Sequence, residues 1–190
     1  YLDPAVWARL SPFRRRVLQL NNTLLGRMIL GPLVGQVAFM AEDWRLIRDG
    51  DRRVLAGWLW HIPPSVAIVA LVLASPMPLW AYLVASYAGL SILKIRTFLE
   101  HQAHERARAR TVIIEDRGLL AFLFLNNNLH VVHHMHPKLP WYRLPQIYFN
   151  NREKYLRRND GYRYASYGEI FRRHLFRAKD PVPHPLYPGR

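Results

Sequence analysis

The chain alternates between charged segments and a long segment without charge. Residues 54–93 contain no Asp, Glu, Lys or Arg, and a Ser-Pro-Met-Pro stretch at residues 75–78 divides this run into two pieces. Each piece is close to the ~20 residues that cross the hydrocarbon core of a bilayer. Trp58, Trp60 and Trp80 lie near the ends of the pieces, where aromatic belts occur in membrane proteins. The pattern therefore predicts a transmembrane hairpin.

The charges that flank this hairpin predict its orientation. Both open ends are basic, whereas the turn at residues 75–78 carries no charge. The flanking basic residues are Arg45, Arg48, Arg52 and Arg53 on one side and Lys94, Arg96, Arg106, Arg108 and Arg110 on the other. Because cytoplasmic segments carry an excess of Lys and Arg, both ends are expected in the cytoplasm. We predict an all-α, integral membrane helical protein with a transmembrane hairpin and a cytoplasmic, histidine-rich helical cap.

The remaining segments are expected to lie at the membrane surface or in the cap. Residues 1–22 are polar and basic, with a turn or helix start at Ser11-Pro12, and Gly and Pro interrupt the apolar residues 23–40. We expect an interfacial or half-buried helix there, followed by a charged connector at residues 42–53. Residues 118–125 are apolar but too few to cross a membrane, so we expect them to pack against the spans. Residues 180–185 are typical of an extended tail.

Composition narrows the class of partner. The chain has 190 residues, enough for one domain, and a formal net charge of +14. Such a charge favours nucleic acid as the partner of a soluble domain, but it is also typical of cytoplasmic segments beside anionic lipid. The charge-free middle has no role in nucleic-acid binding, so we predict a membrane partner and no nucleic acid. The absence of cysteine excludes disulfides, thiolate zinc sites and iron–sulfur clusters within this chain, so any electrons must come from another molecule.

Four histidines fall within the seven residues 130–136. On a helix His130, His133 and His134 stand at i, i+3 and i+4, so that their imidazoles share one face and can converge on a metal. Neutral imidazole suits zinc, copper, iron and nickel. An expression tag would be uninterrupted and terminal, whereas this cluster is spaced, internal and flanked by apolar residues. The sequence therefore predicts a metal site here.

A second pair, His101 and His104, lies just beyond the predicted hairpin, at i and i+3 on any helix that continues out of the membrane. Such a pair is a weak signal by itself. Together the two groups offer five candidate metal ligands: His101, His104, His130, His133 and His134. Five imidazoles exceed what one tetrahedral zinc accepts, so a two-metal site fits better, and imidazole ligation without cysteine suits iron.

Carboxylates near these histidines are candidates for orienting the rings, although most are expected to be solvated. They are Glu100, Glu105, Glu115 and Asp116. The other histidines are expected at polar surfaces or, for His61, at the membrane interface; they are His61, His136, His174 and His184.

The pattern N-x-x-H-x-x-H-H-x-x-P from Asn127 to Pro137 resembles the third histidine box of the membrane fatty acid desaturases. Residues 96–101 (RTFLEH) and 139–145 (LPWYRLP) resemble the stretches on either side of that box in bacterial members, and the resemblance runs over nearly the whole chain. It implies a diiron enzyme that uses O2 and two external electrons to introduce a double bond into the acyl chain of a lipid.

The same resemblance implies roles for particular residues and partners. His101 matches an additional iron ligand ahead of the third box, and Asn127 and Glu100 are expected to support the ligands from behind. The implied partners are the lipid bilayer, an acyl lipid substrate, and a separate electron donor, either ferredoxin or a cytochrome b5-type protein with its reductase. The implied location is a bacterial inner membrane with the metal site on its cytoplasmic face.

One departure from the family pattern keeps alternatives open. Members carry two earlier histidine boxes, H-x(3,4)-H and H-x-x-H-H, which this sequence does not contain. Residues 1–190 are therefore expected to be the C-terminal part of a desaturase-like domain whose second set of ligands lies elsewhere. The alternatives are a lipid or carotenoid hydroxylase or ketolase of the same superfamily, and an inactive truncated fragment.

Overall fold

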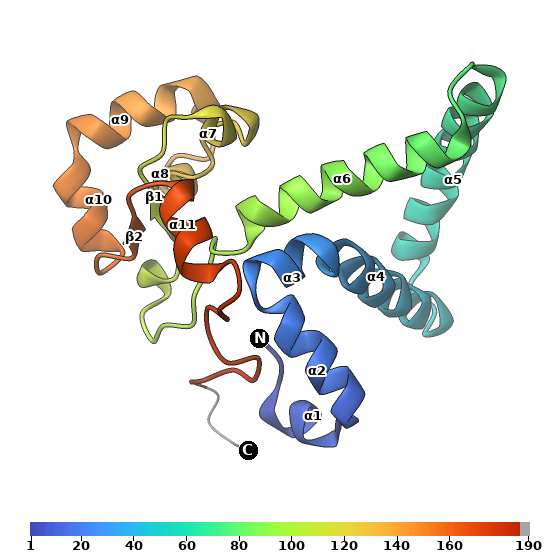
Figure 1. Cartoon of the computed structure of the whole chain (residues 1–190), viewed down its shortest axis with the longest axis horizontal. Helices are drawn as coiled ribbons and strands as arrows, with labels where there is room; N and C mark the ends of the chain where they lie inside the picture. The colour runs from blue at the N-terminus through green and yellow to red at the C-terminus, as the bar shows by residue number, and fades with distance from the viewer. Residues whose placement is uncertain (187–190) are drawn as a thin grey trace.

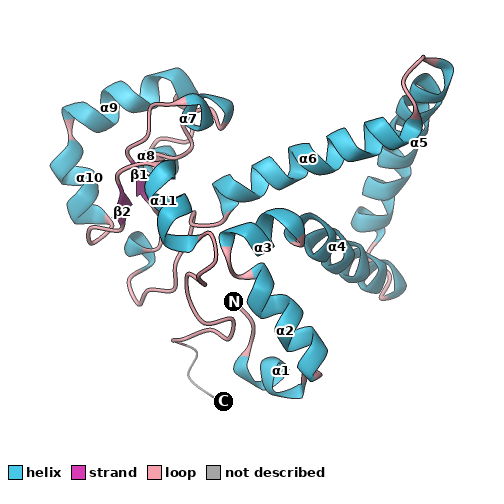
Figure 2. Cartoon of the chain, in the orientation of Figure 1, coloured by secondary structure: helices cyan, strands magenta, loops and turns pink. Residues whose placement is uncertain are grey.

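The structure, a computed structural model, describes residues 1–186 and is mostly helical (Figure 2). The first half of the chain forms six helices: α1 (Pro4–Arg9), α2 (Pro12–Asn21), α3 (Leu24–Ile29), α4 (Gly31–Arg48), α5 (Arg52–Ala74) and α6 (Leu79–Thr97). The second half contains η1 (Ala107–Ala109), β1 (Ile113–Ile114), α7 (Leu119–Leu123), α8 (His130–Met135), η2 (Trp141–Arg143), α9 (Leu144–Asn150), α10 (Arg152–Arg158), β2 (Arg163–Tyr164) and α11 (Tyr167–His174). We call α5 and α6 the arm and residues 98–175 the cap; Figure 1 shows the arm extending away from the cap.

Side-chain caps explain where several helices begin. Ser11 accepts a hydrogen bond from the Arg14 amide at the start of α2, which confirms the helix start predicted at Ser11-Pro12. Asp51 accepts hydrogen bonds from the Arg53 and Val54 amides and so begins α5. The connector predicted at residues 42–53 is wrong in its first part, because α4 continues through these charged residues to Arg48. Charged side chains are compatible with an exposed helix, and only Asp49, Gly50 and Asp51 form the turn.

The arm bears out the predicted division at residues 75–78, which form the turn between α5 and α6. Within the described residues, one helix, α5, is long and apolar enough to cross a membrane. The predicted transmembrane hairpin is therefore not confirmed as a pair of spans. The second helix, α6, has 19 residues and carries Lys94 and Arg96 in its last turn, which lowers its hydropathy.

The helix predicted to carry His101 and His104 out of the arm does not form. α6 ends at Thr97, and His101 forms an isolated antiparallel bridge with Thr111. The Gln102 amide donates to the carbonyl of Arg110, and the Val112 amide donates to that of Glu100. The chain thus turns back on itself as a short ladder, and the i, i+3 relation of the two histidines no longer places them on one face.

Two short strands organise the core of the cap and correct the all-α prediction. β1 pairs in parallel with β2, with Ile113 opposite Arg163 and Ile114 opposite Tyr164. Because successive side chains on a strand point to opposite faces, the two isoleucines enter different apolar clusters. Ile114 packs in a cluster with Leu24, Ile95, Phe98, Leu99, Val112, Phe124, Tyr167 and Ile170. Ile113 packs in a cluster with Leu129, Val131, Val132, Leu144, Tyr148 and Tyr155.

The apolar run at residues 118–125 forms α7, which is too short to cross a membrane, as predicted. Ala121 and Phe124 are buried in the cap, but Leu119, Phe122 and Leu123 are exposed. The prediction that this run packs against the spans is therefore wrong for its outer face. A five-residue helix has only one face toward its own core, so the other face depends on an environment beyond the described residues.

Candidate metal centre

The described part of the chain brings three histidines from two segments together. α8 begins at His130, and its i, i+4 spacing puts His130 and His134 on one face, while the ladder at Thr111 brings His101 against them. One ligand atom from each lies within 4.8 Å of the other two. The Nε2 of His130 is 3.3 Å from the Nε2 of His101 and 3.1 Å from the Nε2 of His134. Three ring nitrogens thus converge on one point.

The environment keeps these imidazoles neutral. His130 is only 6% exposed, and burial, followed by its histidine neighbours, lowers its pKa to about 3. Burial also lowers the pKa of His101 and of His134, with the adjacent histidines adding to the effect. A neutral imidazole presents a nitrogen lone pair, which is the form that binds a metal. The cluster is therefore prepared for a cation rather than for positive side chains.

Asn127 fixes the orientation of the buried ring. Its Oδ1 lies 3.0 Å from the Nδ1 of His130, and because an amide oxygen only accepts, Nδ1 carries the proton. The lone pair of His130 is then on Nε2, toward the other two rings. The Nδ2 of Asn127 donates to Glu100 at 3.4 Å, and Arg96 lies 3.3 Å from Glu100. This line of contacts places Asn127 and Glu100, both predicted to support the ligands, directly behind His130.

His133 and His104, the other two predicted ligands, lie outside this group of three. The ring of His133 stacks on that of His130 at 5.9 Å and lines a different cavity of about 280 Å3. The Nδ1 of His104 accepts from the Arg106 amide, and its Nε2 is 3.9 Å from Asp160. His133 is thus adjacent to the group, whereas His104 makes its contacts elsewhere.

Two other histidines predicted at polar surfaces are partly buried within the cap. The Nε2 of His136 is 3.1 Å from the hydroxyl of Tyr155, and the Nε2 of His174 is 3.1 Å from the hydroxyl of Tyr164. Both therefore contribute to packing, which corrects the surface assignment.

The carboxylate of Glu115 is a structural centre of the cap and does not touch the histidines. It accepts hydrogen bonds from Tyr148, Arg152 and Arg163, which lie on α9, α10 and β2. Burial alone would raise the pKa of this carboxyl, but the three donors outweigh it and lower the pKa to about 2. The carboxylate of Asp116 accepts from the amides of Gly118 and Tyr167. Neither acid is solvated or orients an imidazole.

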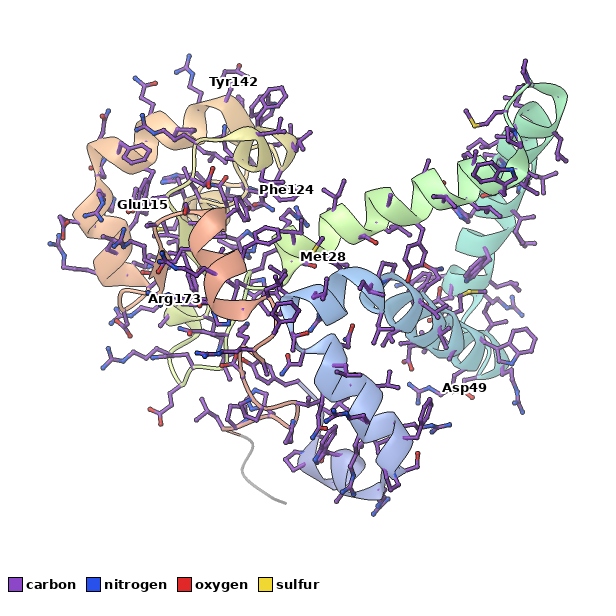
Figure 3. All side chains as sticks on the ribbon, in the orientation of Figure 1. Met28, Asp49, Glu115, Phe124, Tyr142 and Arg173 are labelled. Atoms are coloured by element: carbon purple, nitrogen blue, oxygen red, sulfur yellow. The ribbon has the colours of Figure 1, made fainter. Side chains whose placement is uncertain are left out.

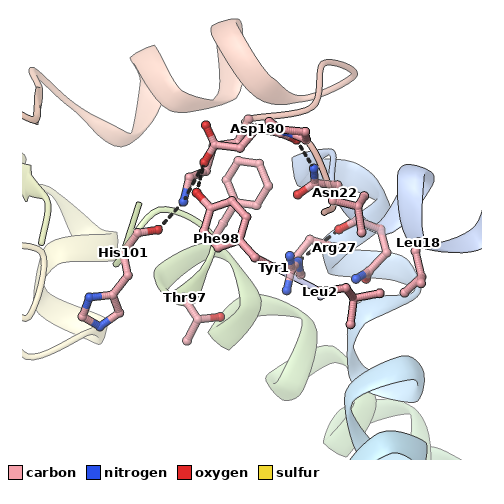
Figure 4. A pocket seen from close by; sticks show the side chains of 13 residues that line it. Tyr1, Leu2, Leu18, Asn22, Arg27, Thr97, Phe98, His101 and Asp180 are labelled. Atoms are coloured by element: carbon pink, nitrogen blue, oxygen red, sulfur yellow. Dashed lines mark hydrogen bonds and ion pairs between the residues drawn. The ribbon is translucent and has the colours of Figure 1, made fainter. Parts of the chain in front are cut away.

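A cavity of about 360 Å3 lies on the other side of His101 (Figure 4). Lys179 donates to the carbonyl of His101 and lies 3.6 Å from Asp180, which also accepts from the hydroxyl of Tyr1. The predicted tail is extended but not free, because the Leu2 amide donates to the carbonyl of Val182. Lys179 therefore anchors the segment that carries His101. Nothing in the sequence pattern indicated this contact, which joins residues 78 positions apart.

Comparison with known families gives one match that covers most of the chain. A family model described as fatty acid desaturase matches residues 1–166. No curated protein and no solved structure matches the chain.

Proposed function

Because this chain belongs to the fatty acid desaturase family, whose members are membrane-bound oxidoreductases, we propose that it oxidises the acyl chain of a lipid at an iron centre held by the cap. The reaction we propose is the introduction of a double bond, with O2 as co-substrate. The single observation that carries this proposal is the convergence of the ring nitrogens of His101, His130 and His134.

The donor set fits the group that the family implies. Three neutral imidazoles without thiolate suit iron that has to change redox state, and the proton on Nδ1 of His130 leaves its Nε2 available. We assign one iron to His101, His130 and His134, and we assign His133, whose ring stacks on His130, to the second iron. His104 is the weakest of the five predicted ligands. When bound, iron supplies the chemistry with dioxygen that removal of hydrogen from an unactivated methylene requires.

The residues around the cluster suit an acyl substrate. The cavity of about 280 Å3 beside His133 is lined by Phe124, Leu125, Leu139, Trp141 and Leu144. Apolar walls of this kind bind a hydrocarbon chain and exclude water from the reacting carbon. Asn127 and Arg96 line the same cavity, so the residues that orient His130 also border the space for substrate.

The remaining parts of the proposal concern location and electrons. We place α5 across a bacterial inner membrane with the basic ends of the arm, and hence the cap, on the cytoplasmic side. Because the chain has no cysteine for an iron–sulfur cluster, the two electrons come from a separate donor, either ferredoxin or a cytochrome b5-type protein with its reductase.

Product analysis tests the reaction. Membranes containing the protein would be supplied with a labelled acyl lipid, O2 and a reducing system, and the products would be analysed by mass spectrometry. Loss of two hydrogen atoms is the result expected of a desaturase. Gain of an oxygen atom would instead establish the alternative, a lipid or carotenoid hydroxylase or ketolase. Absence of any product from iron-loaded protein would indicate the inactive fragment considered above.

A further inference from the structure

The cap exposes a continuous group of large apolar side chains at one edge, which we call the apolar tip. Its residues are Leu119, Phe122, Leu123 and Leu125 from α7 and the turn after it, and Trp141 and Tyr142 from η2. Leu119 is 72% exposed, Phe122 62% and Tyr142 63%. Ring contacts of 6.0 Å join Phe122 to Trp141 and Trp141 to Tyr142, so the two segments form one surface. Figure 3 shows Tyr142 pointing outward at this edge. A continuous apolar surface of this kind marks an interaction site.

The backbone holds one of these side chains outward at a cost. Leu125 adopts a left-handed conformation with a φ of 53°, and Asn126 follows with a φ of 52°. Asparagine tolerates this region, but a leucine there costs roughly 1–2 kcal/mol. The side chain of Leu125 remains 52% exposed, so burial within the cap does not fully offset that cost. A contact outside the described residues would offset it.

The charges around the apolar tip indicate what that contact is. Residues 117–150 contain Arg117, Lys138 and Arg143 but no Asp or Glu. Aromatic and aliphatic side chains surrounded by cations, without acids, are typical of segments that lie in the interface of an anionic bilayer.

The apolar tip also continues into the candidate substrate cavity. Leu125 and Trp141 line the cavity of about 280 Å3 that contains His133. Phe122 lines a second opening together with Arg117, Asn126, Pro145 and Gln146. A lipid in contact with this edge would therefore lie at the mouth of the space beside the histidines.

We propose that the apolar tip is a lipid-contact surface, through which the cap inserts α7 and η2 into the outer part of an anionic phospholipid monolayer. This inference goes beyond the proposed function because it gives the cap a membrane contact of its own, in addition to α5. It rests on the proposed function only for the presence of a bilayer.

Fluorescence quenching tests this surface directly. The chain has no cysteine, so Leu119→Cys and Phe122→Cys each provide a single labelling site. The protein would be labelled with a small environment-sensitive fluorophore and reconstituted into vesicles of phosphatidylcholine and phosphatidylglycerol. Brominated lipid reports contact with acyl chains, and iodide reports contact with water. The water control is Glu153→Cys on α10, whose side chain is 69% exposed, and the lipid control is Leu71→Cys on α5.

We expect labels at 119 and 122 to lose most of their emission to brominated lipid and little to iodide, as the label at 71 does. Quenching by iodide, as at 153, would overturn the proposal in favour of a water-exposed surface. Protection from both quenchers would overturn it in favour of a protein partner. If the label at 71 fails to respond to brominated lipid, the proposed placement of α5 is wrong, while the labels at 119 and 122 still report separately on the apolar tip.

Discussion

The arm and the cap bury apolar residues in opposite ways. None of the side chains of α5 is buried, and Ile95, near the end of α6, is the one buried residue of that helix. In the cap, apolar residues from distant segments form two clusters on either side of β1. The hydrophobic side chains of the arm therefore depend on a surrounding apolar phase, whereas those of the cap stabilise one another.

The same contrast holds for the polar groups. The arm has few polar side chains, and His61 on α5 contacts the hydroxyl of Ser65 within its own helix. The cap connects polar groups across long distances in sequence, as Glu115 does with Arg152 and Arg163. The arm is a membrane element that forms locally, and the cap is a folded unit that assembles a site. The predictions below test this division.

The largest difference is expected between a histidine of the cap and a histidine of the arm. His130→Ala removes the buried member of the cluster, so bound iron and lipid oxidation should fall by at least about 100-fold. His61→Ala should leave both unchanged, because His61 is exposed on α5. Iron content and product yield would be measured for both variants in membranes, with thermal unfolding to detect misfolding. Equal losses in the two variants would contradict the division.

A smaller effect is expected from the residue behind His130. Asn127→Ala removes the acceptor of the Nδ1 proton, so the ring loses its fixed orientation and iron affinity should fall roughly 10–100-fold. Asn150→Ala, an exposed asparagine at the end of α9, is the matched control and should bind iron normally. Competition with a chelator measures both affinities. An unchanged affinity in Asn127→Ala would show that the amide does not orient His130.

Loss of the Glu115 carboxylate should destabilise the cap and leave the arm intact. Glu115→Gln replaces a charged acceptor of three hydrogen bonds, and we expect a loss of roughly 1–2 kcal/mol after allowance for solvent screening. Glu42→Gln on α4, which breaks an exposed pair with Arg45, should have no measurable effect. Hydrogen exchange would show faster opening of α9 and α10 with unchanged protection in α5. Faster exchange in α5 as well would mean that the two regions unfold as one.

The smallest effect is the dependence of cap stability on pH. The pKa of Glu115 falls from an ordinary value of 4.5 to about 2, so the folded cap favours the ionised form. Its contribution is complete above about pH 4.5 and decreases as the pH falls toward 2. Unfolding of the cap followed between pH 6 and pH 2 should show this loss, and the slope should be smaller in Glu115→Gln. An equal slope in the variant would remove Glu115 as the cause.

Local patterns in the sequence predicted the elements that form locally. The charge-free run, the turn at residues 75–78 and the i, i+4 pair of His130 and His134 all depend on residues close in the chain. The predicted helix through His101 and His104 failed because the ladder with Thr111 competes with it, and no periodicity signals such a pairing. The parallel pairing of β1 with β2 and the contact of Lys179 with His101 were missed for the same reason. His101 reached the candidate site through the family resemblance rather than through spacing.

The most direct test compares two histidines that lie three residues apart. The metal content of the purified membrane protein would be measured for His101→Ala and His104→Ala side by side with the unchanged protein. The structure places His101 with His130 and His134 and leaves His104 outside, so His101→Ala should lose most of its iron while His104→Ala retains it. Equal loss from both variants, or no loss from His101→Ala, would contradict the centre described for this cap.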